Sequence, residues 1–477
     1  MENKYVIGLD FGTLSGRALL VDIKNGSIIC SSEKKYAHGV IAGQFLDTGI
    51  KLDSKWALQY PQDYLDVITF IVKDVMEKSN IDPSQIIAIS NDFTSCTLLP
   101  VDKEGTPLCF KEQYKSEPHA YVKLWKHHGA EEQAKRIEQF LQNNYPHCLK
   151  DYGGRISSEF VLPKALEILE NNPDIYNEMT YLIEAGDWIN WMLTGILKRN
   201  NCMMGYKSMW SEDRGYISSD ILVQINPMLQ NFMVEKMAGE ISNIGCKTGY
   251  LTKEWADILG LHPKVVVGTS IIDSFSGITG MGITKPGQLL MTVGTSTCYS
   301  IISDNLVEVG GICGVVKGGA IPNYYCYDAG QACVGDHFEW FVNNMVPEHY
   351  FKEAKTSNKS IHTLLTEKAA QQKIGEHGLL ALDWWNGNRT PYSDYDLTGL
   401  VLGITLQTKP EDIYRCFLEA TAFGAKLILD TFEEAGVKID EIFACGGIAK
   451  KNTIMMQIYA DVIGKKSMHP LLIKHQL

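Results

Sequence analysis

The chain has 477 residues, of which 45% are apolar and 21% charged, and its formal net charge is −12. This length exceeds one ordinary hydrophobic core and predicts two or three domains, at roughly 100–200 residues per domain. The composition excludes a disordered chain, and the acidic balance argues against a general nucleic-acid-binding surface, which needs a basic face.

The cysteines and the apolar runs indicate the compartment. The 12 cysteines are scattered and form no C-x-x-C pair, a pattern typical of reduced, mostly buried thiols in a cytosolic protein. We expect no signal peptide, because strand-like residues follow directly after Met1–Lys4. No apolar run approaches the ~18 residues of a membrane span. A cytoplasmic protein is therefore expected, and the spacing of the histidines predicts no structural metal site.

The first segment, Tyr5–Val21, predicts two strands joined by a tight turn that carries Gly12 and Thr13. Glycine allows backbone N–H groups to approach a phosphate, and the threonine adds a hydroxyl donor. Asp10 comes at the end of the first strand, where a carboxylate suits a hydrated Mg²⁺ or simply caps the turn. Taken alone, such a turn is more often an ordinary hairpin.

The next segments alternate between helix and strand. Residues 38–53 indicate a loop, Pro61 begins a helix with apolar residues at helical spacing, and Ile86–Ser90 follows as a buried strand. This alternation predicts an α/β architecture. Residues 116–200 are expected to be mainly helical, most clearly in Pro163–Leu169 and Asp187–Leu193.

Asp273 ends an apolar stretch that includes the predicted strand Val265–Val267. One interpretation is the N-cap of a helix, and from the residues alone it is favoured. The other is a general base that takes a proton from a substrate hydroxyl during phosphoryl transfer.

The segment Gln288–Ile302 repeats the plan of the first hairpin, with Gly294 and Thr295 in the places of the earlier glycine and threonine. Two such loops facing each other could hold a nucleotide triphosphate from both sides. The repeat indicates an internal duplication with a cleft between the halves. The turn at Lys285 is the predicted boundary, which gives an N-terminal domain of residues 1–284 and a C-terminal domain of residues 285–477.

Near the end, Glu411–Ala435 predicts a helix that stops at Gly436, where a C′ glycine is expected. The predicted strand Glu441–Cys445 then leads into Gly446–Gly447, ahead of an apolar helix at Ile454–Asp461. A diglycine can lie flat against an adenine or ribose, although an ordinary strand-to-helix turn has the same signature. A P-loop site is excluded, because no G-x-x-x-x-G-K-[ST] occurs.

Several side chains are candidate sugar contacts. The polar neighbours of Trp125 favour a place at a cleft, although most tryptophans are core or half-buried residues. Lys207 lies among aromatic residues and could donate to a substrate, unless it is a surface lysine with its stem on apolar neighbours. Trp384 and Trp385 could also offer an apolar face to a sugar ring.

The motifs together resemble the FGGY carbohydrate kinases, and within them the members that act on L-ribulose. They span nearly the whole chain: Leu9–Thr13, Asp92–Pro100, Ser157–Glu159, Glu184–Trp188, Gly205–Trp210, Ala329–Gln331, Val334–Asp336, Asp383–Arg389, Glu419–Gly424 and Gly446–Gly464. The resemblance implies two actin-like ATPase (ribonuclease H-like) domains with a central cleft. It also implies ATP- and Mg²⁺-dependent phosphorylation of L-ribulose to L-ribulose 5-phosphate in arabinose breakdown. No nucleic acid or membrane partner is implied, and members commonly form homodimers.

The resemblance also implies roles for single residues. Asp273 becomes the catalytic base and a sugar contact, and Asp10 serves Mg²⁺ through water. Contacts to ATP are implied for Asp10, Gly12, Thr13, Ser15, Arg17, Gly294, Thr295, Ser296, Gly446, Gly447 and Asn452. Further sugar contacts are implied for Cys96, Trp125, Lys207 and Asp328.

The sequence departs from the family pattern at four places. Leu14, Ser274–Phe275 and Asp328 replace an aspartate, an Ala-His pair and a glutamate. After Lys466 the expected strand and helix are missing, which predicts an unpaired strand edge, lower stability and weaker ATP binding. Two alternatives stay open: a kinase of D-ribulose, ribitol or xylulose, and a non-catalytic sugar- or nucleotide-binding protein.

Overall fold

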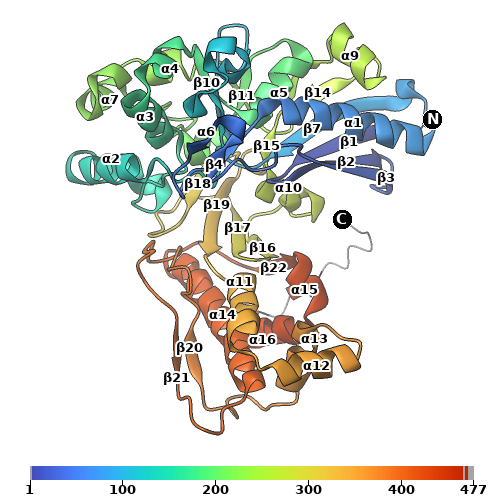
Figure 1. Ribbon diagram of the computed structural model, residues 1–477, viewed down its shortest axis with the longest axis vertical. Coiled ribbons are helices and arrows are strands. Elements are labelled where there is room, and N and C mark those ends of the chain that lie inside the picture. Colours follow the sequence, from blue (N-terminus) through green and yellow to red (C-terminus); the bar gives the residue numbers. More distant parts are fainter. Residues whose placement is uncertain (1–2, 466–467, 471–477) are drawn as a thin grey trace. The chain divides into compact units, whose positions relative to one another are not determined.

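The computed structural model describes residues 3–465 and 468–470, in which helices and strands are mixed along the whole chain (Figure 1). The chain divides into two compact units. The first comprises residues 1–149, 156–276 and 316–323, and the second comprises residues 150–155, 277–315 and 324–477.

The first unit is built on a mixed sheet with the strand order β13-β14-β7-β1-β2-β3. β1 and β2 form the predicted antiparallel hairpin, β3 continues it in antiparallel fashion, and β7 and β14 extend the other side in parallel. The bounds are β1 Tyr5–Phe11, β2 Ser15–Asp22, β3 Ile28–Lys35, β7 Ile86–Phe93, β13 Lys247–Tyr250, β14 Val266–Gly268 and β15 Ile271–Ile272, which also pairs with β7.

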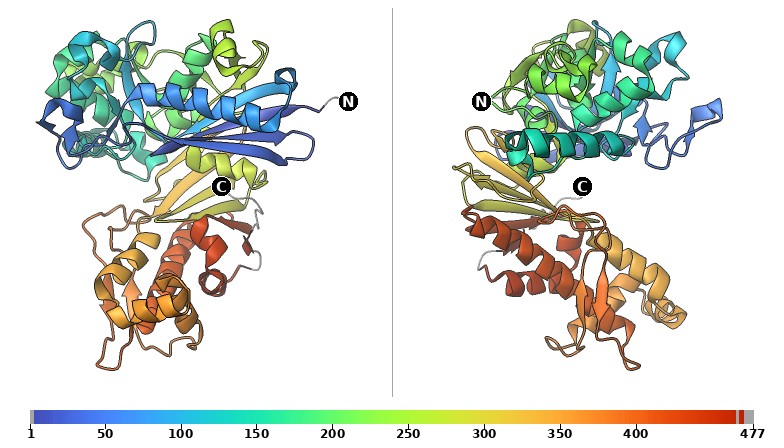
Figure 2. Two further views of the ribbon diagram at one scale, coloured as in Figure 1. Left: turned by 45° about the vertical axis from the view of Figure 1, so that its right-hand side comes forward. Right: turned by 90° about the vertical axis from the view of Figure 1, so that its left-hand side faces the viewer.

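Helix α1 (Pro61–Ser79) covers one face of this sheet beside β2 and β3, as the views in Figures 1 and 2 agree. Pro61 occupies the first helical position, where its missing N–H costs nothing. The apolar residues Val67, Ile68, Ile71 and Val75 recur at helical spacing and are all buried. The predicted helix is therefore confirmed.

The segment of residues 116–200 is mainly helical, as expected. The prediction missed several short strands in that segment and on either side of it. Further helices follow as far as α10 (Asp273–Gly280), which begins in the first unit and ends in the second. The helices are α2 Glu131–Asn144, α3 Val161–Asn171, α4 Pro173–Glu178, α5 Ala185–Thr194, α6 Asn201–Lys207, α7 Ser219–Ile225, α8 Phe232–Glu235, α9 Lys253–Leu259 and α10 Asp273–Gly280. The small strands are β4 Gln44–Phe45, β5 Ile50–Lys51, β6 Leu58–Gln59, β8 Leu98–Val101, β9 Val122–Lys123, β10 Tyr181–Glu184, β11 Lys198–Asn200 and β12 Glu240–Ser242. Of these, β4 and β5 lie in the segment 38–53 that was expected to be a loop.

The second unit repeats the plan with the strand order β18-β19-β17-β16-β22-β23. The hairpin β16–β17 is antiparallel, β19 continues it, and β22 runs parallel to β16. These strands correspond in order and direction to β1, β2, β3 and β7 of the first unit, so the topology agrees with the expected duplication. Their bounds are β16 Gln288–Val293, β17 Thr297–Ser303, β18 Gly314–Lys317, β19 Tyr325–Gln331, β20 Leu380–Leu382, β21 Leu400–Leu402, β22 Glu441–Cys445 and β23 Met468–Pro470.

The long helix α14 (Pro410–Glu434) packs against α16 (Thr453–Ile463) and α13 (Ile361–Ala370) in the core of this unit. Gly436 follows α14 with a left-handed φ of 97°, which confirms the predicted stop. The remaining helices are α11 Gly335–Met345, α12 Glu348–Thr356 and α15 Gly447–Lys451.

The sheet edge after β22 corrects one expectation. β23 pairs in parallel with β22, so β22 does not present the unpaired edge that the sequence predicted. Residues 466–467 and 471–477 lie outside the described part of the chain. Within the described ranges, no helix combines the length and the apolar character needed to cross a membrane.

Candidate functional site

The turn between β1 and β2 connects two of the predicted site residues. The Gly12 amide closes the turn by donating to the Ser15 carbonyl oxygen at 3.0 Å. The Thr13 hydroxyl accepts from the indole Nε1 of Trp125 at 3.0 Å, and the Thr13 carbonyl oxygen accepts from the Gln59 side chain at 2.8 Å. A residue predicted for phosphate and one predicted for sugar therefore touch, while the Thr13 hydroxyl keeps its own hydrogen to donate.

Ser15 and Arg17 both reach toward Glu33 on β3. The Ser15 hydroxyl donates to the Glu33 carboxylate at 2.8 Å, and the Arg17 guanidinium lies 3.4 Å from the same group. Arg17 also donates to the Asp10 carboxylate at 3.0 Å. Within the protein these two side chains thus have carboxylate partners, and the arginine balances the charge of Asp10.

Three aspartates come together where β1, β7 and β15 end. Asp10 on β1 is the register neighbour of Asp92 on β7. Ile271 of β15 also pairs with Asp92, two residues before Asp273. Burial raises the pKa of Asp273 to about 7, the Ser274 amide opposes this by donating to the carboxylate at 2.7 Å, and the charge of Asp10 adds to the rise. A carboxylate with a pKa near 7 is suited to accept a proton at neutral pH.

Asp92 is the site residue that sequence reasoning did not assign. Its carboxylate oxygen Oδ1 is buried and has no hydrogen-bond partner among the described residues. Burial, together with the nearby carboxylates of Asp10 and Asp273, raises the pKa of Asp92 well above its usual value. The signal that could have found it is its place at the end of a buried strand, since parallel strands bring such ends to one edge.

The sugar residues predicted in the first unit differ in exposure. Cys96 is buried in the turn after β7 and has a left-handed backbone, with φ 51°. Lys207 ends α6 and is 6% exposed, which excludes a surface lysine. Its ammonium lies 3.0 Å from the Glu159 carboxylate and 5.5 Å from the centre of the Phe160 ring. Trp125 is 36% exposed.

Asp328, the remaining predicted sugar residue, belongs to the second unit. It lies on β19 opposite Ser300 of β17, and its carbonyl oxygen accepts from the Cys313 amide at 2.8 Å. The predicted sugar residues are therefore divided between the two units.

The second glycine-threonine turn is fixed by the start of α11. The Thr295 carbonyl oxygen accepts from the amides of Val334 at 2.8 Å and Asp336 at 3.3 Å. Because β16 and β22 are parallel neighbours, the loops that follow them leave from one edge of the sheet. Gly446 has a φ of 101°, and a Cβ there would collide with the Val293 carbonyl oxygen, so this approach requires glycine.

The other predicted nucleotide residues lie in the same region. The Gly294 amide donates to the Ser296 carbonyl oxygen at 2.9 Å across the turn. Gly447 is the first residue of α15, and the Asn452 side chain caps α16 by accepting from the Met455 amide at 3.1 Å. Asn452 is thus the N-cap of α16, a role that the sequence analysis did not predict.

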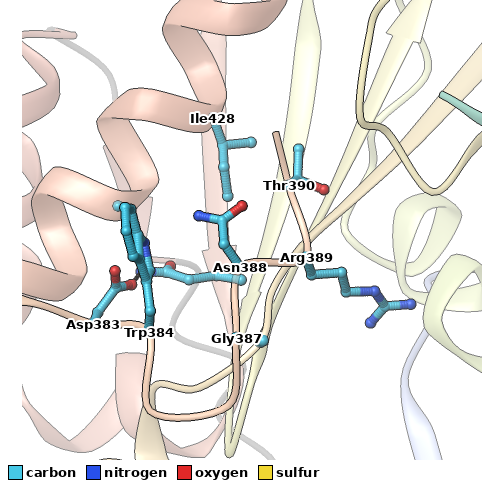
Figure 3. Close-up of a pocket in the computed structure, with 10 residues that line it drawn as sticks. Asp383, Trp384, Gly387, Asn388, Arg389, Thr390 and Ile428 are labelled. Carbon is cyan, nitrogen blue, oxygen red and sulfur yellow. Dashed lines mark hydrogen bonds between the residues drawn. The ribbon is translucent and has the colours of Figure 1, made fainter. Parts of the chain in front are cut away.

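The tryptophan-rich motif of the second unit borders a small pocket (Figure 3). Gln331 donates to the Asp383 carboxylate and, at 2.9 Å, to the Thr421 carbonyl oxygen, while Arg389 extends away from these groups. Burial raises the pKa of Asp383 to about 6. Trp385 packs against the Phe417 ring, with centroids 5.0 Å apart, and so serves the core. The pocket is lined by Gln331, Ala332, Asp383, Trp384, Gly387, Asn388, Arg389, Thr390, Gly424 and Ile428.

A metal at Asp10 would need ligands from outside the protein. In the described part of the chain, no group of three or more histidine, cysteine, aspartate or glutamate side chains is arranged to hold a metal ion. One carboxylate completed by water and phosphate oxygens is nevertheless a common way of binding Mg²⁺. The residues present therefore fit that ion when it arrives with a nucleotide.

Comparison with known proteins places both halves of the chain in one family. The family described as "FGGY family of carbohydrate kinases" matches with its N-terminal domain over residues 5–280 and with its C-terminal domain over residues 289–470. A ribulokinase of Bacillus licheniformis is 49% identical over 449 residues, which are 94% of this chain and 81% of that protein. A ribulokinase of Halalkalibacterium halodurans is 46% identical over 466 residues, or 98% and 83%.

Solved structures support the fold. The xylulose kinase of Rhodospirillum rubrum superposes with a TM-score of 0.80 at 18% identity, covering 97% of this chain and 85% of that chain. The Plasmodium falciparum glycerol kinase with ADP gives a TM-score of 0.75 at 17% identity, with the same coverage. The predicted two-domain α/β fold is thereby confirmed.

Proposed function

The chain belongs to the FGGY family of carbohydrate kinases, and we propose that it phosphorylates ribulose with ATP as the phosphoryl donor. The observation that carries the choice of sugar is the 42–49% identity to ribulokinases over nearly the whole chain. The solved structures of more distant kinases, at 17–18% identity, support the fold alone.

Asp273 supports the chemical step. In the proposed reaction a sugar hydroxyl oxygen bonds to the γ-phosphorus of ATP, and the bond from that phosphorus to the β,γ-bridging oxygen breaks. ADP leaves with the bridging oxygen, and the hydroxyl proton passes to the Asp273 carboxylate. A pKa of about 7 suits this residue, because it can take up the proton and release it again at neutral pH.

The sugar would be held by Cys96, Trp125, Lys207, Asp273 and Asp328. A half-exposed indole offers an apolar face to the carbon chain, and the Lys207 ammonium, oriented by Glu159, can donate to a sugar oxygen.

ATP would be bound by the two glycine-threonine turns and the diglycine loop. The hydroxyls of Thr13, Thr295 and Ser296 suit phosphate oxygens as donors. Gly12 and Gly294, whose amides close the two turns, allow a phosphate to approach the backbone closely. We assign Gly446, Gly447 and Asn452 to the adenosine part of ATP. Ser15 and Arg17 are the remaining proposed ATP contacts. Mg²⁺, when bound with the nucleotide, would neutralise phosphate charge, and Asp10 is the residue that would hold it through water.

The isomer is inferred to be L-ribulose, giving L-ribulose 5-phosphate in arabinose breakdown. The alternatives are D-ribulose, ribitol and xylulose as substrates, and a protein that binds sugar without turnover. Nucleic acid is not among the proposed partners, because the formal net charge of −12 argues against a general basic face. A cytoplasmic homodimer is proposed as the working form.

A coupled ADP-release assay over L-ribulose, D-ribulose, xylulose and ribitol tests the proposal. We expect the highest kcat/KM with L-ribulose. A higher value with another sugar would select that alternative. Calorimetric binding of sugar without ADP release from any member of the panel would identify a non-catalytic binding protein.

A further inference from the structure

Lys164 on α3 is a fully buried lysine whose ammonium has two backbone partners. It donates to the carbonyl oxygen of Cys96 at 2.7 Å and to that of Leu124 at 2.9 Å. Burial lowers the pKa of Lys164, since a charge away from water is costly. A buried ammonium with well-placed acceptors fixes their positions, because removing it would take this donor from the Cys96 carbonyl oxygen and leave the Leu124 carbonyl oxygen with the His127 amide.

The two carbonyl groups belong to segments that carry proposed sugar contacts. Cys96 has a left-handed backbone, which is uncommon for a residue other than glycine and needs support from its surroundings. Leu124 directly precedes Trp125 in the chain. One ammonium therefore joins the Cys96 turn to the Trp125 segment.

A second residue of α3, Glu167, contacts residues that flank Trp125 in the chain. Glu167 follows Lys164 by three residues, and its carboxylate lies 3.0 Å from His127 Nε2 and 3.2 Å from the Lys123 ammonium. All four of these charged or titratable side chains are buried. Trp125 thus lies in a short turn that is anchored by α3 on both sides, while its indole reaches Thr13.

We propose that Lys164 is a positioning residue for sugar binding, which holds the Cys96 turn and the Trp125 segment in the arrangement that receives the sugar. This inference rests on the proposed function, because the sugar roles of Cys96 and Trp125 come from it. Lys164 itself need not touch the sugar, since its side chain is fully buried and two of its three ammonium hydrogens go to the carbonyl oxygens.

A matched control separates this role from simple loss of stability. Arg199 is another fully buried cation of the first unit, and it donates to the carbonyl oxygens of Ala238 at 3.0 Å and Lys236 at 3.2 Å. None of these residues is a proposed site residue. The variants Lys164→Met and Arg199→Met therefore remove the same kind of interaction, one beside the site and one away from it.

The experiment is calorimetric titration of L-ribulose into the full chain and both variants, below their thermal midpoints. Both variants should unfold at lower temperature than the wild type. Only Lys164→Met should raise the sugar Kd, by about 10-fold or more, because displaced contacts weaken binding steeply. The ratio of kcat/KM for L-ribulose over xylulose should also fall in this variant.

An unchanged Kd in Lys164→Met, or an equal rise in Arg199→Met, would overturn the inference. If Lys164→Met does not fold, Lys164→Gln decides, since its shorter amide reaches at most one carbonyl. An unchanged sugar Kd in Lys164→Gln would likewise overturn the proposed positioning role of Lys164. Failure of the wild type to bind any sugar of the panel would instead refute the proposed function, so the two failures are distinguishable.

Discussion

The indole nitrogen of Trp125 donates to the hydroxyl of Thr13 at 3.0 Å and so connects a proposed sugar contact directly with a proposed phosphate loop. The two residues are 112 positions apart in the chain. Any ligand that moves the indole also acts on the threonine, and a phosphate that bonds to the threonine acts on the indole.

A double-mutant cycle measures this connection. Trp125→Phe keeps an aromatic ring but removes the donor, and Thr13→Val removes the acceptor while keeping the shape. We expect each variant to lower kcat/KM for the sugar by roughly 2–13-fold, since a neutral hydrogen bond contributes about 0.5–1.5 kcal/mol. The double variant should lose less than the product of the two effects. Fully multiplicative losses would show that the two side chains act independently.

The pH dependence of the reaction should report Asp273. Its pKa is raised to about 7, so the carboxyl is increasingly protonated as the pH falls below that value. A base must be ionised to accept a proton, and kcat/KM should therefore fall about tenfold per pH unit on the acid side. Initial rates between pH 5 and 9 check this. A flat profile from pH 5 to 7 would contradict the assignment.

Glu184 predicts a pH-dependent stability. Both of its carboxylate oxygens are buried without a hydrogen-bond partner in the described structure, and burial raises its pKa from an ordinary 4.5 to about 8. The folded state therefore binds this proton more tightly than the unfolded state does. Its contribution is fully present below pH 4.5 and is lost as the pH rises toward 8.

Glu184→Gln keeps the shape and removes the titration, so it isolates this effect from that of other buried acids. Relative to the wild type, the variant should gain thermal stability as the pH rises from 5 to 8. Melting curves of both proteins across this range provide the comparison. A constant difference between the two midpoints would mean that Glu184 does not titrate in the folded protein.

Asn452 can be tested as a cap and as a nucleotide contact separately. Its side chain accepts from the Met455 amide, so Asn452→Ala should destabilise the protein by about 1 kcal/mol. Asn452→Ser retains a capping oxygen and should restore most of that stability. The ATP KM should rise in both variants if the amide also contacts the nucleotide. If the ATP KM rises only in the less stable Asn452→Ala and stays at the wild-type value in Asn452→Ser, Asn452 acts as a helix cap and not as a nucleotide contact.

The sequence predicts those parts of the fold that have local signals. α1 and α14 were identified from their spacing and from Pro61 and Gly436, and both hairpins from strand–turn–strand patterns. The strands β9 and β15 were missed because two residues carry no periodicity. Their pairing is decided by neighbours far away in the chain.

The candidate site likewise contains residues that the sequence reveals and residues that only the structure reveals. Asp273 and the glycine-threonine turns are visible as motifs, whereas Asp92 becomes notable only when β7 lies beside β1. Lys164 and Glu184 look like ordinary helix and strand-end residues in the sequence. Their importance comes from burial and from partners that only the tertiary structure brings near.

The central claim is that Asp273 is the base of a sugar kinase, and Asp273→Asn tests it most directly. The amide is nearly isosteric but cannot take up the hydroxyl proton. Steady-state turnover with L-ribulose and ATP should fall by ~10²–10⁴-fold, while calorimetry should show sugar binding within a few-fold of the wild type. Near-normal turnover in Asp273→Asn would contradict the account.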